Sequence, residues 1–399
     1  MRFSDIPVQV KVKQRLIQSV KENRVSHAQL FLGPEGSGKL ALALAYAQYI
    51  NCKNRSEVDS CGSCSSCNKF SKLIHPDLHF LYPINKTKEV TDTKVYSRDF
   101  IVPWREFVLE NKAFVALPDW YDKIGIEKKQ GLINADDADT LNITLAYKAY
   151  EAEYKVMIIW MPEKMNGPAA NKLLKNLEEP PDKTLFILIS ENADQVISTI
   201  LSRTQLIKVP ALETEEVRQF LVENYNLPTG QAANIALVAD GNLANAISKV
   251  QNEIAGLQEV DPEKEKFILL RDWMRKVYVF AVKMREYDQL QQVVTRLIGD
   301  GSREKQKEFL AFTLGILRQC MIYNVGNQQM VKQTGEELEF ISRFSSFVHP
   351  GNIAGFDEEI NKAILHIERN ANAVFVFTDL SLTMARLIKI PAPNHAKKV

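Results

Sequence analysis

Four cysteines lie close together in the sequence and form a set of potential metal ligands. Cys52, Cys61, Cys64 and Cys67 fall within sixteen residues in the pattern C-x8-C-x2-C-x2-C. Four thiolates complete the tetrahedral shell of a zinc ion, and a complete shell has no position for a catalytic water. The spacing therefore predicts structural zinc, with an iron–sulfur cluster as the alternative that four cysteines also allow. The fifth cysteine, Cys320, is predicted to be a buried thiol.

Residues 33–39 have the composition of a loop that binds phosphate. They read Gly-Pro-Glu-Gly-Ser-Gly-Lys and lie between an apolar run and a helical pattern, as a phosphate-binding loop requires. Glycines allow backbone N–H groups to turn toward phosphate oxygens, and the lysine supplies a cation for the terminal phosphates. A Gly-rich turn with a surface lysine is the alternative. The predicted nucleotide-binding residues are Gly33, Gly36, Ser37, Gly38 and Lys39.

The residues that would hold Mg²⁺ and activate water are missing. Leu40 occupies the position of the Ser or Thr whose hydroxyl binds the metal, and an isobutyl group cannot be a ligand. The apolar run 155–160 leads into Trp160 and Met161, where an acidic pair is expected. Glu163 is either a displaced base or, as we favour, a cap for the next helix. We therefore expect no intrinsic hydrolysis, and ATP or ADP binding that is weak or absent.

Apolar and polar patterns place these residues on a parallel sheet flanked by helices. Short apolar runs alternate with helical patterns in the first half of the chain, which is typical of an α/β fold. After residue 211 the strand signals end and helical patterns continue to about residue 390. Residues 84–130 hold many aromatic and charged residues, and we interpret them as an insertion without assignable chemistry. The predicted strands are 28–32, 132–134, 155–160 and 185–190, and the main predicted helices are 39–50 and 169–177.

Length and composition exclude several classes of protein. A chain of 399 residues is too long for one small module, and 45% hydrophobic with 25% charged residues is ordinary for a globular protein. The formal net charge of +1 predicts no bulk attraction to nucleic acid. No apolar stretch reaches the length of a membrane span, and the N-terminus lacks the apolar region of a signal peptide. We expect a cytoplasmic protein with no membrane partner.

Several of these motifs together resemble the AAA+ subunits of the bacterial DNA polymerase III clamp loader. The resemblance rests on the loop, the cysteine pattern, His75-Pro76-Asp77-Leu78, the stretch 163–181 that ends in Glu-Glu-Pro-Pro, and residues 199–205. It implies an AAA+ P-loop domain at 1–208 that includes a zinc module (52–67) and the insertion (84–130). A helical lid at 209–256 and an all-α collar at 257–399 would follow.

Within that family, the departures at Leu40, Trp160 and Met161 resemble the delta-prime subunits, which have a decayed nucleotide site. Ala244 adds a fourth departure, since the motor subunits place a sensing arginine there. The resemblance implies that Arg203, in Ser202-Arg203-Thr204, acts in trans on the ATP of a neighbouring subunit. The alternative is a simple surface arginine. An arginine directed at a γ-phosphate stabilises the charge that develops during phosphoryl transfer.

The resemblance also implies the partners and the function. The partners would be the gamma/tau and delta-type subunits, the sliding clamp and primed DNA. The chain would be a non-hydrolysing accessory subunit of a DNA polymerase (nucleotidyltransferase) holoenzyme that helps load the clamp during replication. An ATP-hydrolysing gamma/tau-like motor subunit is the first alternative, favoured by the intact Lys39. A zinc-knuckle nucleic-acid-binding protein with a vestigial nucleotide fold is the second.

Overall fold

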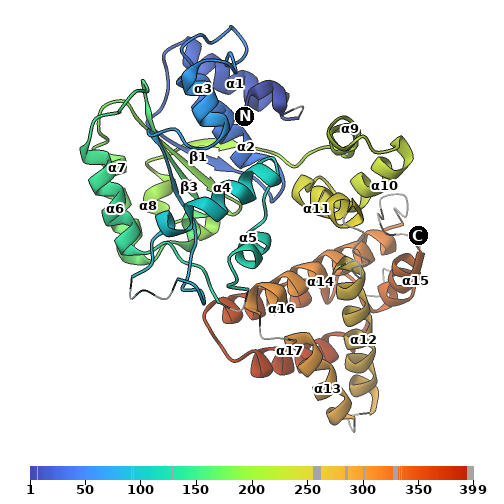
Figure 1. Cartoon of the computed structure of the whole chain (residues 1–399). Coiled ribbons are helices and arrows are strands. Elements are labelled where there is room, and N and C mark those ends of the chain that lie inside the picture. Colours follow the sequence, from blue (N-terminus) through green and yellow to red (C-terminus); the bar gives the residue numbers. More distant parts are fainter. Residues whose placement is uncertain are drawn as a thin grey trace. The chain divides into compact units, whose positions relative to one another are not determined.

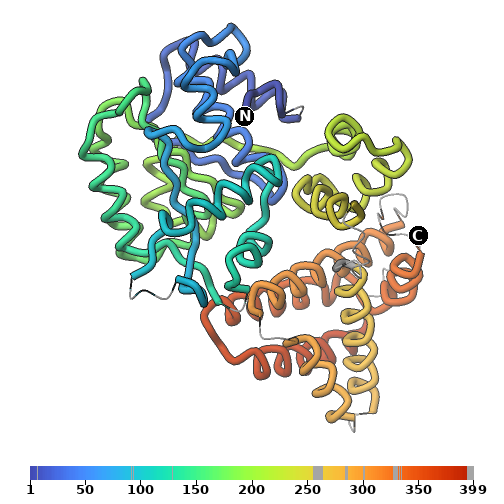
Figure 2. Tube along the Cα trace, viewed as in Figure 1, coloured from blue at the N-terminus to red at the C-terminus, as the bar shows by residue number. Residues whose placement is uncertain are grey.

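The computed structural model divides the chain into two compact units (Figures 1 and 2). It describes residues 1–254, 262–283, 286–299, 302–326 and 335–392, apart from residues 7, 91, 93 and 128, together with residues 331 and 333. The first unit comprises Met1–Ile126 and Gln130–Gly256, and the second Glu127–Lys129 and Leu257–Val399. The predicted boundary between the helical lid and the collar, at residues 256 and 257, falls in the segment 255–261, outside the described residues.

A five-stranded parallel sheet organises the first unit, with the strand order β2-β3-β4-β1-β5. Every residue of the central strands β3 and β4 is buried, as expected where helices cover both faces of a sheet. The strands are β1 (Ala28–Leu32), β2 (Leu78–Leu81), β3 (Lys155–Trp160), β4 (Thr184–Ser190) and β5 (Gln205–Lys208).

The strands predicted at 28–32, 155–160 and 185–190 are confirmed, whereas the strand predicted at 132–134 is wrong. Leu132 and Ile133 form isolated bridges to Ile84 and Met165 and join no named strand. The prediction did not include β2 or β5. Each has four residues, and β5 is mostly exposed, so neither gives a clear pattern of burial.

Helices cover the two faces of this sheet. On one face α6 (Ala135–Ala146) packs beside α7 (Gly167–Glu178) and the short α8 (Ser198–Leu201), as Figure 1 shows. The other face is covered by α2 (Lys39–Ile50), which is buried along its whole length, with α1 (Val10–Lys21) against it. Alternate residues of β3 enter the two cores, with Met157 and Ile159 in one and Val156 and Ile158 in the other.

The described residues of the segment 84–126 form an aromatic layer in the first unit. It contains a 3₁₀ turn and the helices α4 (Ile101–Glu110) and α5 (Leu117–Lys123). Trp104 and Trp120 are fully buried, and Trp104 stacks on Tyr82 with ring centroids 4.2 Å apart. The Trp104 ring also lies 5.2 Å from that of Trp160. The insertion therefore packs on the end of β3.

Three short helices end the first unit and form the segment that we call the three-helix subdomain. They are α9 (Thr214–Tyr225), α10 (Thr229–Ala239) and α11 (Leu243–Ile254). Their buried side chains, among them Val217, Phe220 and Ile247, belong to the same hydrophobic core as α2 and the insertion.

The second unit is all-helical in the part that the structure describes. Its core holds Trp273, whose Nε1 donates to Ser381 Oγ at 2.8 Å, whereas Phe375 is 74% exposed. None of the described helices has both the length and the hydropathy of a membrane span. The helices are α12 (Pro262–Lys283), α13 (Tyr287–Ile298), α14 (Arg303–Asn324), α15 (Gly335–Phe344), α16 (Ile353–Glu368) and α17 (Ala373–Leu387).

Candidate functional site

The five predicted nucleotide-binding residues lie together in the turn after β1 and at the first residue of α2. Gly36 and Gly38 have φ angles of +70° and +87°, a region in which a side chain would be strained. A Cβ on Gly33 would lie 1.8 Å from the carbonyl oxygen of Val209, so only glycine fits beside the residue that directly follows β5. The sequence thus folds here as the strand, tight loop and helix of a phosphate site.

The ammonium group of Lys39 is bound to the loop itself. Lys39 is only 6% exposed, and its Nζ donates to the carbonyl oxygens of Gly33 at 2.7 Å and Pro34 at 2.5 Å. Burial lowers the pKa of Lys39, while the charges of Glu191, Glu35 and Glu163 act in the opposite direction. In this structure the lysine satisfies backbone carbonyls and is not presented to a ligand.

Almost no space remains above the loop. The cavity there has a volume of about 20 Å³, and its lining includes Gly38, Lys39, Phe114, Trp160 and Glu191. A cavity of about 10 to 15 Å³, measured in the same way, is enough for one water molecule. Pockets for ligands of nucleotide size measure about 300 to 1,000 Å³. The loop has the backbone of a phosphate site but no room for a phosphate in this conformation.

The positions that lack metal ligands are parts of the core. Leu40, Trp160 and Met161 are 3%, 2% and 2% exposed, and Trp160 packs against Trp104 of the insertion. A carboxylate in this apolar layer would be costly without a partner. The sequence predicted that these three positions lack metal-binding side chains. The structure shows in addition that apolar side chains fill the space where a metal ion would bind.

Two glutamates near the loop have raised pKa values. Glu191 directly follows β4, and burial raises the pKa of its carboxyl group to about 7. Burial also raises the pKa of Glu163, whose Oε1 accepts from the Glu191 N–H at 3.5 Å. The prediction that Glu163 caps the next helix is wrong, because Asn166 Oδ1 caps α7 by accepting from the Ala169 N–H at 2.9 Å. Sequence reasoning missed Glu191, although its place at the carboxyl end of a strand was a usable signal.

The four predicted zinc ligands come together between α2 and α3 (Ser65–Ser71). The Sγ atoms of Cys52, Cys61, Cys64 and Cys67 all lie within 4.8 Å of one another, and the Cys61–Cys67 pair is 3.9 Å apart. Zn–S bonds of about 2.3 Å in a tetrahedron place sulfurs about 3.8 Å apart. The donor set and its spacing therefore fit a zinc ion.

Backbone N–H groups donate hydrogen bonds to sulfur atoms of this cluster. The N–H of Cys64 donates to Cys61 Sγ at 3.3 Å, and the N–H of Cys61 donates to Cys52 Sγ at 3.2 Å. Backbone hydrogen bonds from Ser63 and Cys64 lower the pKa of Cys61 to about 6. His75 is not a member of this cluster. It is buried, and its Nδ1 accepts a hydrogen bond from the Asp77 N–H at 3.1 Å.

Arg203 lies just before β5 and does not line the cavity above the loop. Its side chain is 35% exposed, and its Nη2 pairs with Glu178 Oε1 at 2.5 Å. Its Nη1 donates to the carbonyl oxygen of Thr199 at 3.0 Å. Its guanidinium is therefore partly exposed and is held by one carboxylate and one backbone carbonyl.

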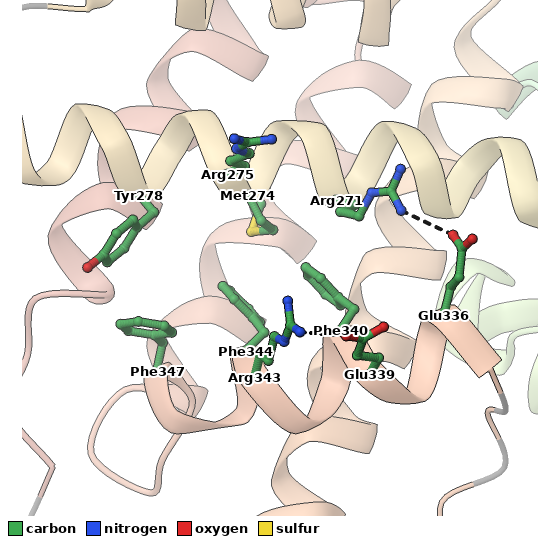
Figure 3. A pocket seen from close by; sticks show the side chains of 10 residues that line it. All are labelled: Arg271, Met274, Arg275, Tyr278, Glu336, Glu339, Phe340, Arg343, Phe344 and Phe347. Atoms are coloured by element: carbon green, nitrogen blue, oxygen red, sulfur yellow. Dashed lines mark hydrogen bonds and ion pairs between the residues drawn. The ribbon is translucent and has the colours of Figure 1, made fainter.

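The second unit has a separate groove of about 730 Å³ between α12 and α15 (Figure 3). Met274, Phe340 and Phe344 form its apolar wall. At its rim Arg271 pairs with Glu336 at 3.2 Å and Arg343 pairs with Glu339 at 2.5 Å. None of the described residues that line this groove belongs to a group of potential metal ligands.

The parallel sheet and the glycine-lysine loop between β1 and α2 define a protein of the P-loop α/β class. The family model described as "DNA polymerase III, delta subunit" matches residues 8–213, and the chain belongs to this family.

Individual relatives come from two subunit types of that polymerase. The delta' subunit of Bacillus subtilis is 27% identical over 246 residues, which are 62% of this chain and 60% of that protein. The tau/gamma subunit of Haemophilus influenzae is 25% identical over 258 residues, or 63% of this chain and 31% of that one. The match thus spans less than two thirds of these relatives. A gamma subunit-related protein of Thermotoga maritima superposes with a TM-score of 0.36 at 13% identity, covering 94% of this chain and 99% of that one.

Proposed function

We propose that this chain is a delta-prime-like subunit of the replicative clamp loader and does not hydrolyse ATP. The observation that carries the proposal is the filled nucleotide site. The space above the loop is about 20 Å³, and the metal-binding and acidic positions are occupied by Leu40, Trp160 and Met161. Phosphoryl transfer depends on a bound metal and on positioned acidic residues, so this site lacks the means to catalyse it.

In this proposal Arg203 is supplied to the ATP site of a neighbouring gamma/tau-type subunit. Its partial exposure and its single carboxylate partner, Glu178, leave it able to exchange one anionic group for another. An arginine that stabilises the transferring phosphoryl group is worth about 10³ to 10⁵ in rate in other NTPases. The delta-type subunit, the sliding clamp and primed DNA are the further partners that we propose.

The cysteine cluster would hold one zinc ion through Cys52, Cys61, Cys64 and Cys67. When bound, the ion supplies a rigid tetrahedral crosslink and no open coordination position. The surrounding chain ties the N-terminus to this module, because both oxygens of Asp59 accept N–H groups, from Phe3 at 3.0 Å and from Ser4 at 2.8 Å. The module would therefore stabilise the first unit.

Replacement of Arg203 in the reconstituted complex tests the trans role. With Arg203→Ala, we expect DNA- and clamp-stimulated ATP turnover by the complex to fall at least tenfold, while the chain still assembles with its partners. Arg218→Ala is the matched control, because Arg218 is also a surface arginine in an ion pair, with Glu215. Unchanged turnover with Arg203→Ala in a fully assembled complex would contradict the role of Arg203.

The second candidate function is that of an ATP-hydrolysing gamma/tau-like motor subunit. It is favoured by the intact Lys39 and by tau/gamma relatives that match 63% of the chain, much as the delta' relatives do. Hydrolysis by the isolated chain separates the two candidates.

A further inference from the structure

A short segment of the insertion, residues 111–116, connects α4 with α5 in a strained conformation. Lys112 and Ala113 have φ angles of +50° and +60°, and two consecutive non-glycine residues in this region are costly. Hydrogen bonds hold the turn, since the Ala113 N–H donates to the Val108 carbonyl at 2.7 Å and the Phe114 N–H to the Asn111 carbonyl at 2.9 Å. Strain of this kind persists where the surrounding structure requires it, often at functional positions.

The turn places the ring of Phe114 against the phosphate loop. A Cβ added to Gly38 would lie 2.9 Å from Phe114 Cε1, so the ring lies directly over this glycine. Phe114 is 3% exposed and, with Ala113 and Val115, lines the small cavity above the loop. The backbone N–H groups that could face a phosphate are therefore covered by an apolar ring.

The same segment contacts the three-helix subdomain on its other side. The rings of Phe114 and Phe220 of α9 meet edge to face with centroids 5.2 Å apart. Lys112 Nζ donates to Asn224 Oδ1 at 2.8 Å and lies 5.1 Å from the centroid of the Tyr225 ring. Segment 111–116 thus touches both the loop and α9.

The start of α11 closes over the loop from another direction. The Leu243 N–H donates to the Gly36 carbonyl at 3.3 Å, and Asn242 Nδ2 donates to Glu35 Oε1 at 2.9 Å. A Cβ on Gly36 would lie 2.0 Å from Asn242 Oδ1, so the two segments are in close contact. Loop, subdomain and insertion are therefore packed against one another.

We propose that residues 111–116 are an internal occupant of the nucleotide site, in which the Phe114 ring takes the place of a nucleotide as the link between the phosphate loop and the three-helix subdomain. The position of the subdomain is then fixed by the chain itself and does not change with a nucleotide cycle. This inference rests on the proposed function, because a motor subunit would need the site open.

Hydrogen exchange and ADP binding by the full chain test this inference. In Phe114→Ala we expect the amides of α9 and α11 to exchange at least tenfold faster than in the wild type. We expect ADP to bind Phe114→Ala with a Kd below about 1 mM and to reverse part of the added exchange, whereas it does not bind the wild type. Adding Lys39→Ala should remove this binding. Leu109→Ala is the matched control, because Leu109 is an apolar residue of the same insertion that is 47% exposed.

Two results would overturn the inference. One is equal exchange of α9 and α11 in Phe114→Ala and in Leu109→Ala, and the other is ADP binding to the wild type as tight as to Phe114→Ala. If Phe114→Ala unfolds, Phe114→Leu is compared in the same way, since it keeps an apolar side chain and removes only the ring. ATP hydrolysis by the wild type contradicts the proposed function, whereas unchanged exchange without hydrolysis contradicts this inference alone.

Discussion

Two charged residues around the loop, Lys39 and Glu191, lack the contacts and the charge state that nucleotide hydrolysis requires. The Lys39 ammonium donates hydrogen bonds to carbonyl oxygens of the loop. Glu191 is the charged group with the largest effect on the pKa of Lys39, and burial raises the pKa of Glu191 itself to about 7. Burial favours the neutral form of Glu191, and a metal ligand must be ionised, so this carboxyl group is poorly suited to hold Mg²⁺.

The raised pKa of Glu191 predicts a pH-dependent stability. The folded state holds a proton that the unfolded chain releases near pH 4.5, so the contribution of Glu191 to stability is lost as the pH rises from 4.5 through 7. Glu191→Gln should remove this loss. At pH 8 we expect its free energy of unfolding to exceed that of the wild type by about 2 kcal/mol, after allowance for the partial exposure of the side chain.

Denaturant unfolding at pH 5 and pH 8 measures this difference. The gap between Glu191→Gln and the wild type should be small at pH 5 and should grow toward pH 8. Glu358→Gln, at an exposed glutamate of α16, is the control and should show no such change. A gap that is the same at both pH values would contradict the raised pKa.

At the residue scale, the sequence predicted what the loop lacks but not what fills it. Leu40, Trp160 and Met161 are recognisable because they stand at fixed positions of a motif. Phe114 comes from an insertion that follows no motif, and its contact with Gly38 depends on a turn with two left-handed residues. No local pattern in the sequence specifies that contact.

At the scale of elements, the insertion and the cysteine module differ in how much of their structure can be predicted from the sequence. The module has a spacing that restricts its geometry, and the structure brings its four sulfurs within 4.8 Å. The insertion has only a composition rich in aromatic residues. The cluster that its Trp104 and Trp120 form with Tyr82 and Trp160 arises from long-range packing, which short-range patterns do not encode.

The cysteine module predicts one zinc ion per chain, measurable by elemental analysis of the purified protein. Cys64→Ser should lower the zinc content to well below half an ion per chain. It should also lower the free energy of unfolding by at least about 2 kcal/mol, because metal binding and folding of such a module are coupled.

Cys320→Ser is the control for the metal content, since Cys320 lies in the core of the second unit and should leave the zinc bound. A zinc-free protein with the thermal stability of the wild type would contradict the proposed site. Iron with sulfide in place of zinc would support the iron–sulfur alternative.

At the scale of the whole molecule, the fold class was predictable because its central strands are long apolar runs. The parallel sheet with flanking helices and the helical second half follow from these patterns. The strands β2 and β5 were not predicted, since they are short and take their place from pairing with β3 and β1. The site was predictable as a decayed loop, whereas its closure by other segments was not.

Steady-state ATP hydrolysis by the purified full chain tests the central claim most directly. The measurement is made with Mg²⁺, with and without primed DNA, and with Lys39→Ala as the background. We predict that the wild type shows no turnover above this background under either condition. Turnover by the wild type that Lys39→Ala abolishes would contradict the account and would support the motor-subunit alternative.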